Sequence, residues 1–164
     1  MPELPEVEFA VRKLRDWMAG ATVEAIEASP GKPLRDLAPA DLQVLHGQRL
    51  TDVRRRGKQM FLDFERHTLL VHLGMTGKWI PAETPPRGGT RMRWRLSSGA
   101  FDFVDWRRFG RVRLLPIGGS HPEVDKLGPD ALELCAERAE FARRVKGGRA
   151  IKLVLMDQSV LAGV

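Results

Sequence analysis

The sequence predicts an α+β fold: an N-terminal antiparallel β-sandwich flanked by helices, followed by the first helices of a truncated helical domain. Three observations support this prediction. Apolar residues recur at helical spacing over residues 7–18. Short runs between residues 22 and 115 alternate apolar and polar side chains, which is typical of strands in a sandwich or barrel. Helical spacing then returns after residue 131.

The first helix is predicted over residues 5–18. Pro5 suits the first turn, where a missing backbone N–H costs nothing, and Gly20 follows as a natural stop. The apolar side of this helix consists of Val7, Ala10, Val11, Leu14, Trp17 and Met18. A second, short helix is expected over residues 39–46, so two helices flank the sandwich.

Strands are predicted wherever apolar residues alternate with polar ones. The alternation is clearest where arginines separate Met92, Trp94 and Leu96. The expected strands cover residues 22–28, 60–64, 68–73, 76–80, 91–96, 100–104 and 111–115. Residues 81–90, rich in proline and glycine, are expected to form a loop.

Composition changes divide the chain into three parts. We expect a catalytic β-sandwich domain at residues 1–117, a linker at 118–130 that contains glycine and proline, and the beginning of a helical domain at 131–164. Helices are predicted over residues 131–145 and 150–158. Since they have no obvious partner of their own, this second domain is expected to be incomplete.

The charge balance favours a polyanionic partner. The chain has 27 Lys and Arg against 21 Asp and Glu, which gives a net charge of +6 and a pI near 10.1. Nucleic acid is the simplest such partner. Cys135 is the single cysteine, which excludes an internal disulfide and a four-cysteine zinc site within this chain. No apolar run approaches the roughly 20 residues that span a bilayer, so we expect a cytoplasmic protein without a membrane partner.

The N-terminal residues could carry covalent chemistry. If Met1 is removed, Pro2 begins the chain with a free secondary amine, and α-amino groups titrate at roughly pH 8. Such an amine can form a Schiff base with an aldehyde-like carbon, and Glu3 beside it could transfer protons. The alternative is purely structural, because acidic residues such as Glu3, Glu6 and Glu8 suit the positive end of a helix dipole.

Two further segments are candidates for contact with nucleic acid. Residues 54–58 (Arg-Arg-Arg-Gly-Lys) concentrate four positive charges around an expected turn, which suits a phosphate backbone. Met75 in a glycine-bracketed turn, and Arg107 and Phe109 on a connector, could form a wedge that holds a duplex open after a base is extruded. A solvated basic turn and ordinary core or surface side chains are the alternatives. The four histidines form no His-Glu-x-x-His pattern, and no serine lies in a nucleophile elbow.

These segments together resemble the formamidopyrimidine-DNA glycosylase family, bacterial enzymes that remove oxidised purines from DNA. The resemblance covers essentially the whole chain. The segments that carry it, in order, are Pro2-Glu3-Leu4-Pro5-Glu6-Val7-Glu8, Gly57-Lys58, His72-Leu73-Gly74-Met75-Thr76-Gly77, Arg107-Arg108-Phe109-Gly110 and Ile151-Lys152 with Leu155-Met156-Asp157-Gln158.

The resemblance implies a role for each of these residues. Pro2 would attack the sugar C1′, Glu3 would transfer protons, and Glu6 would support the site. Lys58, counted with the catalytic residues, and His72 would hold phosphates beside the lesion. Met75, Arg107 and Phe109 would fill the gap left by the flipped nucleotide. Arg108 would contact DNA, and Lys152 would approach the lesion from the second domain.

The resemblance also implies partners and cofactors. The implied partner is double-stranded DNA that contains 8-oxoguanine, a formamidopyrimidine or an abasic site. The protein is expected to bind it as a monomer, at the nucleoid in the bacterial cytoplasm. No metal or cofactor is expected in this chain, although full-length relatives carry one structural zinc in a C-terminal finger that is missing here. The activity of the chain alone is expected to be weak or absent. Two other readings stay open: a non-catalytic DNA-binding module of the same origin, and a generic RNA-binding β-domain.

Overall fold

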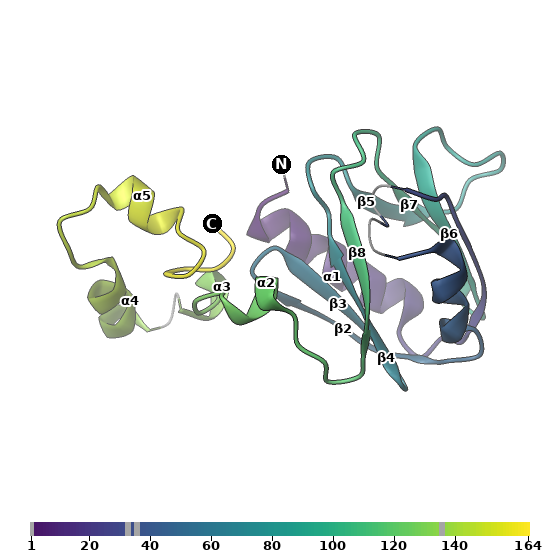
Figure 1. The fold of residues 1–164 in the computed structure, drawn as a ribbon, viewed down its shortest axis with the longest axis horizontal. Coiled ribbons are helices and arrows are strands. Elements are labelled where there is room, and N and C mark those ends of the chain that lie inside the picture. The colour runs from purple at the N-terminus through teal and green to yellow at the C-terminus, as the bar shows by residue number, and fades with distance from the viewer. Residues whose placement is uncertain (1, 32–33, 35–36, 135–136) are drawn as a thin grey trace.

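The computed structural model describes residues 2–31, 34, 37–134 and 137–164. Two four-stranded antiparallel sheets, ordered β1-β6-β7-β5 and β2-β3-β4-β8, form a sandwich (Figure 1). The strands are β1 (Val23–Ala28), β2 (Leu50–Arg56), β3 (Gln59–Phe64), β4 (His67–His72), β5 (Lys78–Pro81), β6 (Thr90–Leu96), β7 (Gly99–Val104) and β8 (Arg111–Pro116). The helices are α1 (Leu4–Met18), the 3₁₀ helix η1 (Pro39–Leu45), α2 (Pro122–Asp125), α3 (Ala131–Leu134), α4 (Arg138–Val145) and α5 (Ile151–Leu155). The predicted fold class is confirmed.

Helix α1 forms where its apolar period predicts it. A proline lies in its first turn, and the backbone N–H of Glu3 donates to the Glu6 carboxylate at 2.9 Å, which ties the residue before the helix to its first turn. The helix buries its apolar side against the sandwich, with Val7, Val11, Leu14 and Met18 inside. Burial of this side fixes the direction in which the N-terminus of the helix points.

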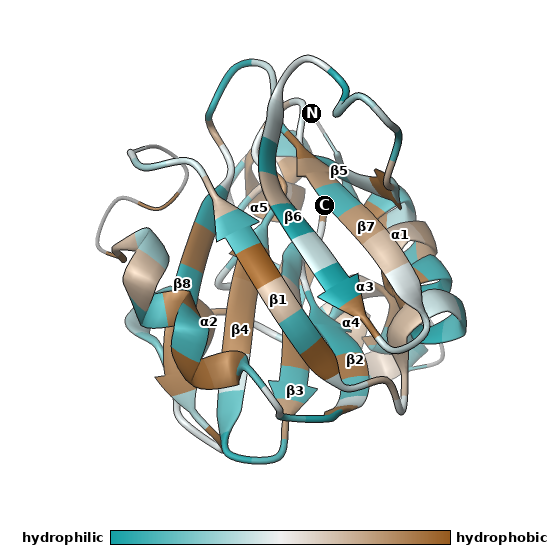
Figure 2. Cartoon of the chain, turned by 90° about the vertical axis from the view of Figure 1, so that its right-hand side faces the viewer, coloured by the Kyte–Doolittle hydropathy of each residue, from teal (hydrophilic) through white to brown (hydrophobic). Residues whose placement is uncertain are grey.

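The core lies between the two sheets and is rich in aromatic rings. Trp94 is fully buried, stacks against Phe64 with ring centroids 5.9 Å apart, and meets the edge of Trp79 at the same separation. Along β6, Met92, Trp94 and Leu96 are buried while the arginines between them are not, as the alternation predicts. Strand β1, whose brown and teal bands are seen in Figure 2, departs from this alternation, because its buried residues Val23 and Ile26 are three positions apart.

Strand β3 departs from simple alternation because both of its faces are covered. Met60, Leu62 and Phe64 face the main core, as predicted. Phe61 instead joins a second apolar cluster, in which Val124 of α2 takes part. The short helix α2, inside the predicted linker, therefore covers the outer face of this sheet.

Three predicted elements are corrected by the structure. The arginines at positions 54–56 belong to strand β2, and only Gly57 and Lys58 form the turn. The helix predicted over 131–145 is interrupted: α3 ends at Leu134, and Glu137 has a non-helical backbone before α4 begins. The segment at 39–46 is a 3₁₀ helix. Met1 and Cys135, which the sequence singled out, lie outside the described residues.

The C-terminal segment returns to the sandwich beside the start of α1. The carbonyl of Gly163 accepts a hydrogen bond from the Leu4 N–H at 3.1 Å. A Cβ at position 163 would lie within 2.5 Å of the Leu4 side chain, and the φ of Gly163 is +107°, so glycine permits this close approach. Helices α4 and α5 extend away from the sandwich (Figure 1). The return brings both ends of the described chain to the edge of the sandwich that faces α4 and α5 (Figure 1).

Candidate active site

The N-terminal string and the β2–β3 turn meet at this edge. Lys58 forms an ion pair with the Glu3 carboxylate, and its side chain is largely buried while that of Glu3 is half-exposed. Pro2, directly before Glu3, is partly buried. Glu6 is exposed and accepts the Glu3 N–H. The fold therefore brings a backbone nitrogen, a carboxylate and an ammonium group from two segments 55 residues apart (58 − 3) into one place.

The turn that carries Lys58 is held by a buried ion-pair cluster. Asp130, at the start of α3, accepts a hydrogen bond from the Gly57 N–H at 2.7 Å and pairs with both terminal nitrogens of Arg55. Arg55 also donates to Glu8 of α1 at 2.9 Å. The Arg55 and Asp130 side chains are 5% and 3% exposed, so this cluster links α1, β2 and α3 inside the protein.

The predicted basic turn is consequently not a free phosphate-binding cluster. Arg54 pairs with Asp63, Arg55 is buried with two carboxylates, and Lys58 pairs with Glu3. Arg56 donates to the Leu127 carbonyl at 3.1 Å. The prediction of an open basic cluster was wrong for Arg55, whose partners lie in segments that a local pattern does not reveal, whereas Arg54 and Arg56 are exposed.

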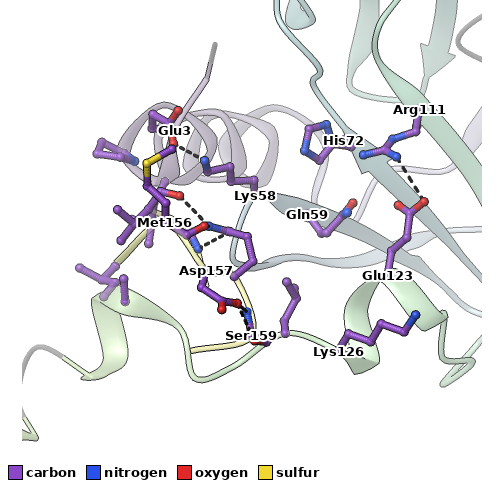
Figure 3. A pocket seen from close by; sticks show the side chains of 18 residues that line it. Glu3, Lys58, Gln59, His72, Arg111, Glu123, Lys126, Met156, Asp157 and Ser159 are labelled. Carbon is purple, nitrogen blue, oxygen red and sulfur yellow. Dashed lines mark hydrogen bonds and ion pairs between the residues drawn. The ribbon is translucent and has the colours of Figure 1, made fainter. Parts of the chain in front are cut away.

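A cavity of about 1050 Å³ opens between the sandwich and the C-terminal segment (Figure 3). Of the predicted site residues, Glu3, Lys58 and His72 line it. Its other polar wall residues include Gln59, Arg111, Glu123, Lys126, Asp157, Gln158 and Ser159. Figure 3 shows the Glu3–Lys58 pair on one side of the cavity and His72 with the Arg111–Glu123 pair on the other.

His72 is held as a neutral hydrogen-bond donor. Its Nδ1 accepts the Gly74 N–H at 3.0 Å, so the ring proton lies on Nε2. The pKa of His72 is lowered to about 4, mainly by burial and also by the positive charges of Arg111 and Lys58, which outweigh the opposing effect of the Glu123 carboxylate. A neutral ring with a free Nε2–H can donate to a phosphate oxygen without carrying charge.

We expect His72 to stay neutral throughout the physiological range. The unfolded ring titrates at about 6.5, so between pH 6.5 and 4 the unfolded chain binds more protons than the folded one. The contribution of His72 to stability is therefore fully present above pH 6.5 and is lost as the pH falls toward 4. NMR titration of the ring, with the urea-unfolded chain as reference, measures this difference. A folded-state midpoint near 6.5 would contradict it.

Two loops next to this cavity are joined to each other. They are the Met75 turn (residues 73–77) and the segment we call the wedge loop (residues 105–110). The Thr76 hydroxyl donates to the buried Asp105 carboxylate and accepts the Arg107 N–H at 3.1 Å. The same carboxylate accepts the Gly110 N–H at 2.7 Å. Asp105 thus fixes both loops by hydrogen bonds that reach 29 residues along the chain.

Close backbone packing strengthens this junction. Gly74 has a φ of +65°, and a Cβ there would overlap the backbone of Phe109 and Gly110. Only glycine both adopts this positive φ readily and has no Cβ to overlap that backbone. Met75 is 40% exposed and Phe109 is 43% exposed, and the Arg107 guanidinium lies 5.0 Å from the centre of the Phe109 ring. The predicted Met–Arg–Phe group is therefore assembled from two rigidly connected loops and directed to solvent.

The other seven predicted site residues do not line the cavity: Pro2, Glu6, Met75, Arg107, Arg108, Phe109 and Lys152. Lys152, on α5, is exposed and does not line it. Arg108 is exposed in the wedge loop, with a φ of +57° that side chains other than glycine rarely adopt. Such strain persists only where neighbouring contacts enforce it; here the Arg107 N–H is held by the Thr76 hydroxyl and the Gly110 N–H by the Asp105 carboxylate.

The sequence did not predict Arg55, Arg111, Glu123 or Asp130 as parts of this edge. A weak signal existed for Asp130, because aspartate directly before a helical run is a typical N-cap. Its carboxylate does accept the Leu132 N–H at 3.1 Å. No local signal marks its pairing with Arg55, which lies 75 residues away.

Within residues 2–31, 34, 37–134 and 137–164, no group of three or more His, Cys, Asp and Glu side chains is placed to hold a metal ion. The single cysteine of the chain does not fit a four-cysteine zinc site. The described helices include none with both the length and the apolar character needed to cross a membrane.

Comparison with known proteins gives a consistent result. A family profile for the formamidopyrimidine-DNA glycosylase N-terminal domain matches residues 1–112. The whole chain aligns with formamidopyrimidine-DNA glycosylases of Stenotrophomonas maltophilia, at 36% identity, and Aromatoleum aromaticum, at 40%. It spans 62% of the length of each.

Solved structures agree with these sequence matches. The Lactococcus lactis Fpg protein, in complex with DNA that contains an abasic site, aligns with a TM-score of 0.86 and 26% identity, over 99% of this chain and 62% of its own. The MutM (Fpg) protein of Thermus thermophilus aligns with a TM-score of 0.80 and 34% identity, over 99% of this chain and 60% of its own.

Proposed function

The chain belongs to the formamidopyrimidine-DNA glycosylase family, and we propose that it carries the catalytic part of a base-excision repair enzyme. The proposed substrate is double-stranded DNA that contains an oxidised purine, such as 8-oxoguanine or a formamidopyrimidine. The proposed activities are removal of that base and cleavage of the strand at the resulting abasic site. One observation carries the proposal: Glu3, the residue directly after Pro2, forms an ion pair with Lys58, and both side chains line a cavity between the two parts of the chain.

The proposed chemistry begins at the Pro2 nitrogen. The free amine forms a bond to the sugar C1′ as the bond from C1′ to the damaged base breaks, and the base leaves with a proton. Glu3 donates the proton that opens the sugar ring and leaves an iminium ion between Pro2 and C1′. This cation acidifies the adjacent C2′–H, so a base can remove that proton and the 3′-phosphate leaves. A second elimination releases the 5′-phosphate, and water then hydrolyses the imine.

The other predicted residues bind and hold the DNA in this proposal. Lys58 and His72, both on the cavity wall, receive phosphates beside the lesion, one as a cation and one as a neutral donor. The exposed Met75, Arg107 and Phe109 enter the space vacated by the extruded nucleotide. Lys152 would reach DNA from α5 only outside the cavity, since it does not line the cavity.

A second candidate function is non-catalytic DNA binding. The sequence begins Met1-Pro2, and while Met1 is attached the Pro2 nitrogen is an amide with no nucleophilic lone pair. The exposed wedge side chains do not depend on that nitrogen, so binding would survive without chemistry. We also propose that the protein acts in the bacterial cytoplasm, as its bacterial relatives suggest. A last proposal is that the catalytic chemistry uses Pro2, Glu3 and Lys58 and no cofactor in this chain.

Borohydride trapping on duplex DNA with an abasic site distinguishes the two candidates. A chain whose mass shows a Pro2 terminus should give a covalent protein–DNA adduct. A chain extended by Gly-Ser before Pro2 should give at least about 100-fold less, because its nitrogen is an amide. Lys126→Ala is the matched control, since it removes another amine that lines the same cavity, and it should leave the adduct unchanged.

Two outcomes oppose the catalytic proposal. An adduct that persists in the extended chain would assign the chemistry to another amine. A chain with a verified Pro2 terminus that binds the duplex but gives no adduct would favour the non-catalytic module.

A further inference from the structure

Trp106 is an exposed aromatic residue directly before Arg107 in the wedge loop. Its side chain is 60% exposed, whereas Trp79 and Trp94 are buried and Trp17 is partly buried. Its ring rests against the backbone of the segment before β6, where a Cβ at Gly88 or Gly89 would approach the ring to 2.6 and 2.9 Å. Two consecutive glycines therefore give the ring a flat support and leave much of it open to solvent.

Two exposed or partly exposed arginines flank Trp106: Arg91 is hydrogen-bonded to the residue before it, and Arg108 follows two residues after it. Arg91 donates from Nε to the Asp105 carbonyl at 2.9 Å, and the Asp105 N–H donates to the Gly89 carbonyl at the same distance. Burial and the positive charge of Arg108 lower the pKa of Arg91, and they outweigh the opposing effect of the Asp105 carboxylate. Among the described residues, the ion pairs include neither arginine.

We propose that Trp106, Arg91 and Arg108 form a binding site for one unstacked nucleotide of the DNA next to the wedge. The base stacks on the Trp106 ring, and the two guanidinium groups receive its phosphate. This inference rests on the proposed function and extends its DNA contacts beyond Met75, Arg107 and Phe109.

The combination of groups selects a nucleotide over other ligands. A supported aromatic ring offers a stacking surface that accepts any base, and a guanidinium that has no carboxylate partner is well suited to phosphate. A purely structural role for Trp106, as a cover for the Gly88–Gly89 turn, would not explain why neither Arg91 nor Arg108 forms an ion pair although the positive charge of Arg108 acts on Arg91. A bound phosphate would supply the missing negative partner.

Tryptophan fluorescence tests the proposal, because Trp106 is the tryptophan most accessible to a ligand. The probes are a duplex with a non-cleavable abasic analogue and a fully paired duplex of the same sequence. We expect the abasic duplex to quench the fluorescence, and we expect Trp106→Ala to abolish the quenching and weaken binding about tenfold. Trp106→Phe should retain most of the affinity, because it keeps a stacking ring. The fully paired duplex, which has no free base face, should be bound almost equally by all three proteins.

The arginines and a matched control complete the experiment. Arg91→Gln should weaken binding and reduce the salt dependence by about one unit of slope. Phe9→Ala removes another exposed ring, 63% exposed with the Lys13 ammonium 5.6 Å away, from the outer face of α1. It should leave affinity unchanged, and melting temperatures should show that every variant is folded.

The proposal is overturned if Trp106→Ala binds the abasic duplex like the parent protein, or loses affinity equally for both duplexes. Absence of binding to both duplexes would overturn it as well. Failure of the proposed catalysis is a separate result, because the analogue cannot react and the binding measurement does not depend on a free Pro2 amine.

Discussion

Replacing Asp130 by alanine is expected to lower the free energy of unfolding by about 3–5 kcal/mol. The substitution leaves the Arg55 guanidinium buried with only Glu8 as a charged partner, and it removes the acceptor of the Gly57 N–H. Urea denaturation measures the change. Since the Gly57 turn carries Lys58, the yield of borohydride adduct should fall in the same variant.

The pH dependence of this contribution has a definite sign. Burial alone would raise the pKa of Asp130, but hydrogen bonds from Arg55 and the Gly57 N–H outweigh it and hold that pKa below its ordinary value. The stabilisation is therefore fully present above about pH 4, where the unfolded carboxyl is ionised, and is lost as the pH falls through the folded pKa.

Two comparisons make the Asp130 result specific. Asp130→Asn should cost less than alanine, because its amide oxygen can still accept the Gly57 N–H. Glu27→Ala breaks an exposed pair with Arg95 and should cost less than about 1 kcal/mol. If Asp130→Ala were no more destabilising than Glu27→Ala, the cluster would not hold the two parts of the chain together.

Substituting Glu3 by glutamine is expected to reduce the rate of base removal from 8-oxoguanine duplexes by about 10²–10⁴-fold. Glutamine keeps the shape of the side chain but cannot deliver or take up a proton, and it leaves Lys58 without its carboxylate. Stability should change little, because the Glu3 side chain is 43% exposed. Single-turnover base release measures the rate.

The abasic-site reaction separates proton transfer from nucleophilic attack in this variant. The Pro2 amine is unaltered by the substitution, so borohydride should still trap an adduct on DNA that already lacks the base. Glu24→Gln, an exposed carboxylate on β1, is the control and should retain both activities. Full base release by Glu3→Gln would assign the proton transfer to another group.

Local sequence patterns were sufficient to predict the helices and strands that bury only one face. The period of Val7, Val11, Leu14 and Met18 specifies α1 because a helix of 3.6 residues per turn places them on one side. The alternation of β6 specifies a strand because neighbouring side chains point to opposite faces. The Met75 turn and the wedge loop could also be recognised, since their glycines and exposed apolar residues are local features.

Ion pairs between residues far apart in the sequence could not be predicted from these local patterns. Three arginines in a row indicate an open basic turn. In the structure, however, Arg54 forms an ion pair with Asp63, and Arg55 forms ion pairs with both Glu8 and Asp130. The interruption between α3 and α4 was missed because helical periodicity continues across it.

The sequence by itself predicted an antiparallel sandwich or barrel, its first helix and the identity of the residues that could react. Only the tertiary structure decided which of those residues meet. The Glu3–Lys58 pair, the Asp105 junction of two loops and the neutral state of His72 all depend on burial and on partners far along the chain. Ion pairs and hydrogen bonds form between groups that lie a few ångströms apart in space, and the separation of two residues along the chain does not predict that distance.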